Sequence, residues 1–477
     1  MDIKQGTWGA AARNLGSRAL DRAASGTRLP AGCVLASCVL LGCEGTPDRW
    51  DPQPSNPLVL LCVDGLEPTI VSAMIEQGRL PAMASFAERG VLGSIETLIP
   101  TWSPVIWTTI ATGRSKEAHG VEFFLEETHT NLPYTSNARK VPALWNLVSD
   151  AGLTVDLVGY WVTWPAEEIN GRVLASYAAQ AQANVIWKPG LWENLDHQTW
   201  PPELAQELEP LITFLKDDGE AVDAFLEEFS KPQHGNDLIG TLYRDLAWTR
   251  TGDRSFANVA RHFLENDPAD LSIVYLSLPD VAGHRFWRYH QPSDMDYPVD
   301  ESEVRAYGDM IRRCYEVTDA ELGSLLERIP ENANVVLISD HGMHADSSTK
   351  GDPKAITSGH HQAGPSGVFG AFGPAFAQTG SLYTKQDRRG RIGEVRCIAP
   401  LALHLLGLPV PEDWPIARFG NALDDLLDPA WLKANPGRLR TSPDLLWLDE
   451  WPRSLPMAPG GDLNLGFQQA MEELGYF

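Results

Sequence analysis

Basic residues are scarce in this sequence relative to acidic ones, with 38 Lys and Arg against 63 Asp and Glu and a formal net charge of −25. Such a chain offers no extended basic surface for a polyanion, which argues against binding of nucleic-acid polymers as its main role. An acidic protein can still bind a small phosphate ester, because metal ions in a site dominate the local field. The charge balance therefore disfavours a nucleic-acid polymer as partner and is compatible with a small phosphate-ester substrate.

Cysteine is also scarce. Only six cysteines occur among 477 residues, and three of them, Cys33, Cys38 and Cys43, fall in one short apolar stretch near the N-terminus. The other three cannot all pair with one another, so the sequence indicates no disulfide framework. Cys62 lies inside a strand-like apolar run, and we interpret it as an ordinary core residue.

Long hydrophobic runs are absent as well. The apolar run over residues 31–42 has the length of the hydrophobic region of a signal peptide and is too short to span a membrane. It ends in Leu40-Leu41-Gly42-Cys43, which resembles the lipobox of bacterial lipoproteins, in which the cysteine becomes the lipidated first residue. A second match ends at Cys38, but Cys43 leaves the longer apolar run before the cut. The alternatives are a short buried helix or an uncleaved anchor.

This N-terminal pattern predicts a lipoprotein signal peptide over residues 1–42, with lipidation at Cys43. Residues 43–56 are rich in Pro, Asp and Ser and are expected to form a flexible tether. The lipid would be the protein's membrane partner. The expected location of the exported protein is the periplasmic side of the inner or outer membrane.

Three continuous apolar runs, at residues 58–63, 272–278 and 334–339, have the form of strands buried on both faces of a parallel sheet. Between these runs, apolar residues recur at the spacing of a helix, for example over 303–329. We therefore expect an α/β fold with a central, mostly parallel sheet flanked by helices. The expected catalytic domain covers 57–430, with an inserted cap region at about 160–261 that is rich in Trp, Pro, Asn and Gln. A C-terminal tail over 431–477 is expected to pack on the core.

Each of these apolar runs leads to an acidic residue, namely Asp64, Asp280 and Asp340. In parallel sheets, ligands bind outside the carboxyl ends of the strands. A single Asp at such a position is more often a turn or cap residue than a ligand. Three of them at three strand ends, with histidines close by, indicate a functional site.

Histidines accompany two of the three carboxylates. Asp280 and His284 are four residues apart on what we expect to be a loop, and Gly283 would let the chain turn sharply between them. Mixed carboxylate and imidazole sets suit zinc, and also manganese or iron, although a lone histidine is more often a structural residue. The remaining histidines of the set are His341, directly after Asp340, and the pair His360 and His361 on a Gly-rich segment.

A hydroxyl nucleophile is expected where residues 101–109 enter a helix. Pro104 would be the first helical residue and Ser103 the N-cap, which alone is a structural role. The same geometry offers free N–H groups and the positive end of a helix dipole to a phosphate. A hydroxyl there can also become a metal-activated nucleophile, and Thr101 is the rival candidate to Ser103.

These segments together resemble the alkaline phosphatase superfamily, and most closely its type I phosphodiesterase/nucleotide pyrophosphatase branch. The resemblance spans about residues 57–375, with the motifs in the family's order. It is carried by Val63-Asp64-Gly65, Ser103-Pro104 through Ala111-Thr112-Gly113, His119-Gly120, Pro279-Asp280 with Gly283-His284, Ser339-Asp340-His341-Gly342-Met343, and Gly359-His360-His361.

The resemblance implies an alkaline-phosphatase-like fold and two divalent metal ions, with zinc favoured and manganese or iron as alternatives. One ion would be held by Asp64, Asp340, His341 and Ser103, and the other by Asp280, His284 and His361. Counting back from Thr112-Gly113, Ser103 falls on the position of the family's nucleophile. The implied reaction passes through a covalent phosphoseryl enzyme that water then hydrolyses. His119 also matches a family position, but we interpret it as structural.

The sequence departs from the family at one substrate-binding position. Nucleotide pyrophosphatases usually place an Asn three residues after the nucleophile, where this chain has Ile106. Despite this departure, we expect a metal-dependent phosphodiesterase or pyrophosphatase. The alternative is a phosphomonoesterase or phosphonate hydrolase, and a non-catalytic envelope lipoprotein is a weaker one. The chain has no Cys/Ser-x-Pro-x-Arg motif, which disfavours a sulfatase.

Overall fold

The computed structural model describes residues 50–53, 55–124, 134–176, 197–213, 237–381, 391–412, 414 and 426–440. All of them belong to one compact unit, Asp48–Phe477. The predicted signal peptide, Cys43 and residues 441–477 of the predicted tail lie outside the described residues. Within the described ranges, no helix combines the length and the apolar character needed to cross a membrane.

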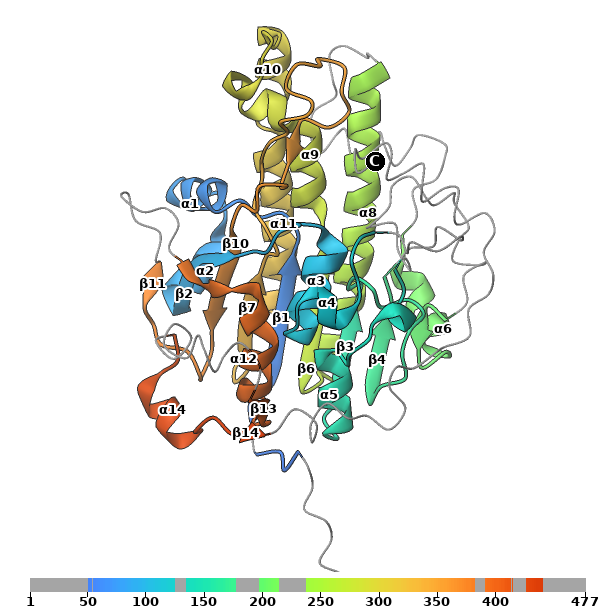
Figure 1. The fold of residues 1–477 in the computed structure, drawn as a ribbon, viewed down its shortest axis with the longest axis vertical. Helices are drawn as coiled ribbons and strands as arrows, with labels where there is room; N and C mark the ends of the chain where they lie inside the picture. The colour runs from blue at the N-terminus through green and yellow to red at the C-terminus, as the bar shows by residue number, and fades with distance from the viewer. Residues whose placement is uncertain are drawn as a thin grey trace, which may run out of the picture. The chain divides into compact units, whose positions relative to one another are not determined.

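A ten-stranded mixed sheet forms the centre of this unit (Figure 1). Its order is β11-β2-β10-β7-β1-β6-β3-β4-β5, with β12 also paired to β2, and β7, β1, β6, β3 and β4 run parallel to one another. This confirms the expected α/β class with a mostly parallel sheet. The strands are β1 (Leu58–Val63), β2 (Gly90–Glu96), β3 (Val155–Val158), β4 (Gly171–Leu174), β5 (Thr199–Trp200), β6 (Leu271–Leu276), β7 (Asn334–Ile338), β10 (Gly367–Phe372), β11 (Gly380–Ser381) and β12 (Arg391–Glu394).

The three predicted strands are the central ones. Every residue of β1, β6 and β7 is buried, as expected for continuous apolar runs covered on both faces. Because β1 pairs in parallel with both β6 and β7, the residues that follow the three strands meet at one edge of the sheet. Two short ladders lie apart from the sheet, β8 (His344–Ala345) with β9 (Gly359–His360) and β13 (Val410–Pro411) with β14 (Leu439–Arg440).

Helices pack in two groups against the sheet. One group, drawn in front of the sheet in Figure 1, contains α3 (Ser103–Thr112), α5 (Leu144–Asp150) and α12 (Ile398–Leu405), which contact one another. The helices of the other group also contact one another and lie behind the sheet in the same view. They are α2 (Pro81–Arg89), α8 (Asp237–Asn266), α9 (Leu278–His290) and α11 (Met310–Leu326). The other α-helices among the described residues are α1 (Pro68–Glu76), α4 (Lys116–His119), α6 (Leu204–Leu208), α10 (Glu301–Tyr307) and α14 (Pro429–Ala434).

The predicted cap over 160–261 is wrong for much of its length. Strand β4 pairs in parallel with β3 inside the central sheet, and α8 packs on α9 and on β6. The polar and aromatic composition of this span concealed these core elements. Residues 177–196 and 214–236 of the predicted cap lie outside the described residues.

The packed part of the chain also begins earlier than the predicted tether allows. Trp50 is buried, and its indole N–H donates a hydrogen bond of 2.5 Å to Asp150 at the end of α5. The backbone N–H of Gln53 donates to the carbonyl of Gly407 at 3.1 Å. The predicted tether over 43–56 is therefore wrong for the residues from Trp50 onward, because they are fixed to the folded unit.

Candidate active site

Asp64, Asp340 and His341 meet at the carboxyl ends of β1 and β7. His341 Nε2 lies 3.3 Å from Asp64 Oδ1 and 3.2 Å from Asp340 Oδ2. All three side chains are buried and offer ligand atoms that lie within 4.8 Å of one another. The structure thus brings together the two carboxylates and the imidazole of the first predicted metal-ligand set, and the role of Ser103 in that set stays a prediction.

The second predicted set is rearranged. Asp280 and His361 form a group within 4.8 Å together with His341, which therefore belongs to both groups. The imidazole of His361 stacks on that of His341 with ring centroids 3.8 Å apart. His284 approaches this group through Asp280, with Nε2 3.5 Å from Asp280 Oδ1. His341 is thus placed between the two sets, which the sequence alone did not reveal.

Asp280 and His284 lie on a helix, and the loop expected between them is wrong. Both belong to α9, where residues four apart share one face, so the spacing that suggested a loop is produced by one helical turn. Gly283 makes no sharp turn. A Cβ atom at this position would lie 2.7 Å from Met343 Cε, so Gly283 lets α9 approach the segment after Asp340 closely.

Gly65 provides the second close approach. Its φ of 73° lies in the left-handed region that favours glycine, and a Cβ atom there would lie 2.6 Å from Asp280 Cα. A side chain at this position would therefore push the end of β1 away from α9. Gly65 is needed to bring Asp64 and Asp280 to the same site.

The start of α9 is held by a residue from the predicted cap. The carboxylate of Asp253 on α8 accepts hydrogen bonds from the backbone N–H groups of Ser277 and Leu278 at 2.8–3.0 Å. These N–H groups belong to the first turn of α9 and have no partner within the helix. Asp253 thus positions the helix that carries Asp280 and His284.

Two histidines have their tautomer set by a main-chain carbonyl. His341 Nδ1 lies 2.9 Å from the carbonyl oxygen of Gly342, and His284 Nδ1 lies 2.8 Å from that of Gly359. Because a carbonyl oxygen only accepts, each Nδ1 carries the proton and each Nε2 is left with its lone pair. This is the arrangement in which a second contact orients a metal-ligating histidine.

Ser358 joins α9 to the segment that carries His361. Its backbone N–H donates to the carbonyl of His284 at 2.7 Å, and its hydroxyl accepts from the backbone N–H of Arg288 at 3.2 Å. Together with the hydrogen bond from His284 to the Gly359 carbonyl, these contacts fix α9, which carries Asp280 and His284, against the segment that carries His361. In the sequence, Ser358 stands out only by its place before Gly359-His360-His361.

Two aromatic residues that the sequence did not suggest hold Asp64. Asp64 Oδ2 accepts hydrogen bonds from the Tyr275 hydroxyl at 2.5 Å and from Trp107 Nε1 at 2.9 Å. In the sequence, Tyr275 is an aromatic residue in an otherwise largely aliphatic strand, and Trp107 lies four residues after Ser103. Both signals are weak, since buried aromatic residues are usually core.

Ser103 lies at the first position of α3, and Trp102, not Ser103, is the N-cap residue. Ser103 and Trp107 are four residues apart and share one face of α3. Because Trp107 contacts Asp64, that face looks toward the first ligand set. His361 also makes a hydrogen bond with the backbone of Thr101, which brings the residues just before α3 beside the second set.

The buried ligand atoms carry the signature of a cation site. Among the described residues, Asp64 Oδ1, Asp280 Oδ1, Asp340 Oδ2 and His341 Nε2 have no hydrogen-bond partner. Buried polar atoms without partners are costly, and acceptor atoms at 3.2–3.3 Å repel one another unless a cation lies among them. The donor set therefore fits divalent metal ions of the zinc type.

The pKa values of these groups shift in the directions that burial imposes. Burial, and then the charge of Asp64, raises the pKa of Asp280 and that of Asp340 well above the usual range of a carboxyl. Burial lowers the pKa of His284 and of His361 well below the usual value, so both imidazoles are neutral and ready to act as ligands. A cation would reverse the shift of the carboxyls by stabilising their ionised forms.

His119 has the structural role that we expected for it. Its Nδ1 accepts from the backbone N–H of Val121 at 3.1 Å, so Nε2 carries the proton and donates to the Thr109 hydroxyl at 3.0 Å. Burial lowers its pKa to about 3. With both nitrogens engaged, His119 braces α3 and is not a candidate ligand.

Several solved structures are similar to this chain. The structure is similar to an inactive form of murine ectonucleotide pyrophosphatase/phosphodiesterase 5 in complex with AMP, at 13% identity and a TM-score of 0.44, over 79% of this chain and 100% of that one. It is similar to a putative sulfatase from Bacteroides thetaiotaomicron at 15% identity and a TM-score of 0.45, over 76% and 73% of the two chains. A phosphonoacetate hydrolase from Sinorhizobium meliloti shows 17% identity and a TM-score of 0.37, over 62% and 59%.

The sequence comparison defines the family. Among curated proteins, none matches the chain. The family model described as type I phosphodiesterase / nucleotide pyrophosphatase matches residues 58–355, which cover β1, α3, α9 and β7 and more than half of the chain. The chain therefore belongs to the type I phosphodiesterase/nucleotide pyrophosphatase family, within the alkaline phosphatase superfamily that its sequence motifs predicted.

Proposed function

We propose that this protein is a two-metal phosphoester hydrolase of the phosphodiesterase type, which acts through a covalent phosphoseryl intermediate at Ser103. The observation that supports this most strongly is the convergence of one buried oxygen from each of three carboxylates with the lone pair of His341 Nε2, because none of these four atoms has a hydrogen-bond partner among the described residues. Ionised carboxylates in such a cluster repel one another, and a cation among them offsets this repulsion.

The residues divide between two metal ions. Asp64, Asp340 and His341, with the Ser103 hydroxyl, would hold one ion, and Asp280, His284 and His361 would hold the other, with His341 close to both sets. When bound, the ions would lower the pKa of the Ser103 hydroxyl and neutralise charge on the phosphate and the leaving oxygen. Zinc is favoured by the mixed carboxylate and imidazole ligands, and manganese or iron are the alternatives.

Ser103 would act as the nucleophile in two displacements. Its Oγ loses the hydroxyl proton and forms a bond to phosphorus, while the bond from phosphorus to the leaving alcohol breaks. Water then attacks the phosphoserine, releases phosphate or a phosphomonoester, and restores the hydroxyl. At the start of α3, Pro104 has no N–H and the N–H groups of Val105 and Ile106 donate to the Trp102 carbonyl at 2.9 Å, so the backbone N–H of Ser103 is the first-turn group that would stabilise the oxyanion.

Ile106 limits the substrate assignment. It occupies the position where the family usually has a phosphate-binding Asn, and it is fully buried. Binding of the phosphate oxygens must then depend on the backbone at the start of α3, the metals and other hydroxyls. A small phosphodiester is therefore a better supported substrate than a nucleotide, although a structural neighbour was solved with AMP.

Substitution of the nucleophile tests this proposal. Ser103→Ala should abolish turnover of bis-p-nitrophenyl phosphate while about two equivalents of metal remain bound, because only one ligand of one ion is lost. Thr101→Ala is the matched control and should retain most of the activity. Persistent activity in Ser103→Ala, with loss in Thr101→Ala, would identify Thr101 as the nucleophile.

A panel of p-nitrophenyl esters tests the substrate class. Faster turnover of the bis-ester than of the mono-ester supports the phosphodiesterase, and the reverse result supports the phosphomonoesterase alternative. Turnover of a phosphonate monoester above both would favour a phosphonate hydrolase. A protein that binds metal but hydrolyses none of these esters would have the fold of the family without its activity.

We also propose that the protein is exported and anchored by a lipid at Cys43. The support is the lipobox-like sequence at residues 40–43 alone. Cys43→Ser should release the protein from the membrane fraction and prevent incorporation of labelled palmitate, whereas Cys38→Ser should change neither. The opposite pattern would assign the lipid to Cys38.

A further inference from the structure

We propose that Tyr275 and Trp107 are positioning residues that hold Asp64 as a metal ligand through one oxygen only. The inference rests on the proposed function, because it concerns how the first metal-ligand set is oriented. Both hydrogen bonds reach the same oxygen, Oδ2, whereas Oδ1 has no hydrogen-bond partner among the described residues and faces His341 Nε2 at 3.3 Å.

The direction of the Tyr275 hydrogen bond is fixed by a second indole. Trp161 Nε1 lies 2.8 Å from the Tyr275 hydroxyl oxygen, and an indole N–H can only donate. The Tyr275 oxygen therefore accepts from Trp161, which leaves its own proton for Asp64. The two hydrogen bonds from Trp161 to Tyr275 and from Tyr275 to Asp64 thus run in one direction, and the first strengthens the second.

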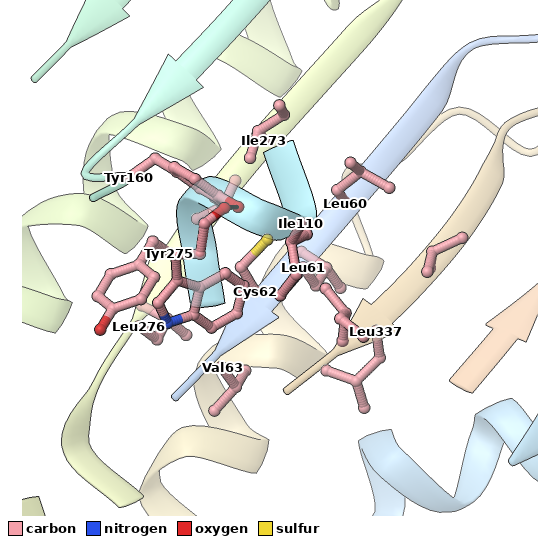
Figure 2. Close-up of a cluster of buried hydrophobic side chains, with 14 of the residues drawn as sticks. Leu60, Leu61, Cys62, Val63, Ile110, Tyr160, Ile273, Tyr275, Leu276 and Leu337 are labelled. Carbon is pink, nitrogen blue, oxygen red and sulfur yellow. Dashed lines mark hydrogen bonds between the residues drawn. The ribbon is translucent and has the colours of Figure 1, made fainter. Parts of the chain in front are cut away.

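This arrangement joins four parts of the fold. Asp64 follows β1, Tyr275 lies on β6, Trp107 lies on α3, and Trp161 follows β3. Tyr160 packs beside Trp107 and Tyr275, but its hydroxyl donates to the main-chain carbonyl of Trp107 at 2.7 Å and not to a side chain that holds Asp64. Figure 2 shows Tyr160 and Tyr275 among the buried side chains beside Cys62 and Val63 of β1. All of these aromatic residues are buried, so Asp64 has little freedom to rotate.

Trp107 also aligns the nucleophile with the metal. It lies one helical turn after Ser103, on the same face of α3, so the bond from Trp107 to Oδ2 fixes α3 relative to Asp64. A second oxygen of Asp64 at the cation would occupy a coordination position that the serine hydroxyl or the substrate phosphate needs. With Oδ2 occupied by two donors, that position stays open.

The test is metal binding by Tyr275→Phe. This variant keeps the ring and removes only the hydroxyl, and we expect the affinity of the Asp64 set for Zn²⁺ to fall by about tenfold or more. The affinity of the Asp280 set should stay as in the wild type. Competition with a chromophoric chelator gives both affinities, and Co²⁺ absorption bands report the coordination of the weakened site, independently of any turnover.

Tyr160→Phe is the matched control. It removes another buried hydroxyl of the same cluster, but one that bonds a main-chain carbonyl and no ligand. Its Zn²⁺ affinities should match those of the wild type. If Tyr275→Phe fails to fold, Trp107→Phe removes the second donor to Oδ2 and should also weaken only the Asp64 set.

The inference is overturned if folded Tyr275→Phe and Trp107→Phe variants bind both ions as the wild type does. It is overturned equally if both sets weaken together, since that pattern indicates a general loss of packing. A wild-type protein that binds two ions and hydrolyses no ester would refute the proposed function instead, and the site-selective loss of affinity would still support the positioning role.

Discussion

At the level of single residues, burial and metal binding favour opposite protonation states of two site carboxyls. Asp280 and Asp340 are buried beside Asp64, and this raises their pKa values, whereas a bound cation requires them ionised. The histidines have lowered pKa values and are neutral in the free protein. Metal binding must therefore displace protons from carboxyls, not from imidazoles.

This predicts that metal binding releases protons. In the metal-free protein, the raised pKa values keep protons on the carboxyls at a pH where exposed carboxyls are ionised, so affinity for Zn²⁺ should increase as the pH rises. Calorimetric titrations at one pH, in two buffers of different ionisation enthalpy, measure the number released. Asp280→Asn should release fewer protons than the wild type. Equal heats in both buffers would contradict the raised pKa values.

The sequence indicated the candidate ligands but not their surroundings. Asp64, Asp340 and His341 could be found because each follows an apolar run that predicts a buried strand. Tyr275 and Trp107 could not, because a buried aromatic residue that donates a hydrogen bond looks the same in sequence as one that only packs. The position of His341 between both sets was equally hidden, since stacking on His361 depends on the folded backbone.

At the level of elements, the site depends on contacts between helices and neighbouring segments. Asp280 and His284 were expected on a loop because they follow a strand-like apolar run and Gly283 lies between them, yet they lie on α9. Pro279 falls in the first helical turn, where its missing N–H has no cost, and Asp253 satisfies the N–H groups beside it. The predicted helix over 303–329 is also divided, into α10 and α11.

Ser358 provides a test of the contact between α9 and the His361 segment. Ser358→Ala removes the hydroxyl that accepts from Arg288 N, so His284 and His361 should be held less firmly against each other. We expect Zn²⁺ affinity of the Asp280 set to fall about tenfold, with the Asp64 set unchanged. Ser358→Thr should restore it, and Ser347→Ala, at an exposed serine of the same loop, is the control. Unchanged affinity in Ser358→Ala would leave the hydroxyl without a role.

A second test concerns α2, which has no side-chain cap of its own. Asp319 on α11 accepts from the backbone N–H groups of Ala82 and Met83 at 2.9 and 2.8 Å, and burial raises its pKa to about 6. A carboxyl whose pKa is higher in the folded state than in the unfolded state stabilises the folded protein most at low pH. This contribution is fully present below the unfolded pKa of about 3.9 and is lost as the pH rises through the folded pKa of about 6.

Asp319→Asn replaces the carboxyl with an amide that does not ionise in this range, and it keeps one oxygen that can accept from the backbone N–H groups of α2. The stability of the wild type relative to this variant should therefore fall by about 3 kcal/mol between pH 4 and pH 7, most of it before pH 6. Urea unfolding of both proteins across this range measures the difference. Parallel stability profiles would show that Asp319 has the same pKa in the folded and unfolded states.

At the level of the whole molecule, the fold class was predictable and the boundaries were not. Continuous apolar runs mark the central parallel strands, whatever surrounds them. The strand β4 and the helix α8 were assigned to a cap because their residues are mixed in polarity, although they pack on the core. Boundaries depend on contacts between distant segments, such as the one between Trp50 and Asp150, which no local pattern encodes.

Truncation at the N-terminus tests where the folded unit begins. A protein that starts at Asp48 keeps Trp50, the bond from Gln53 N to Gly407 and the ion pair of 3.0 Å between Asp51 and Arg438. A protein that starts at Pro57 loses all three. Because the Trp50 side chain is fully buried, we expect the shorter protein to be less stable by about 3 kcal/mol or more, while the longer one matches a full-length protein with Cys43→Ser.

Urea unfolding of the three proteins, each loaded with Zn²⁺, measures this difference without changing the metal site. Trp50→Ala in the longer protein should reproduce most of the loss, which would assign it to the buried indole and not to chain length. Both truncated proteins should bind two equivalents of metal, because residues 50–56 do not contribute ligands. If the proteins that begin at Asp48 and Pro57 were equally stable, residues 50–56 would belong to the flexible tether. The folded unit would then begin at β1.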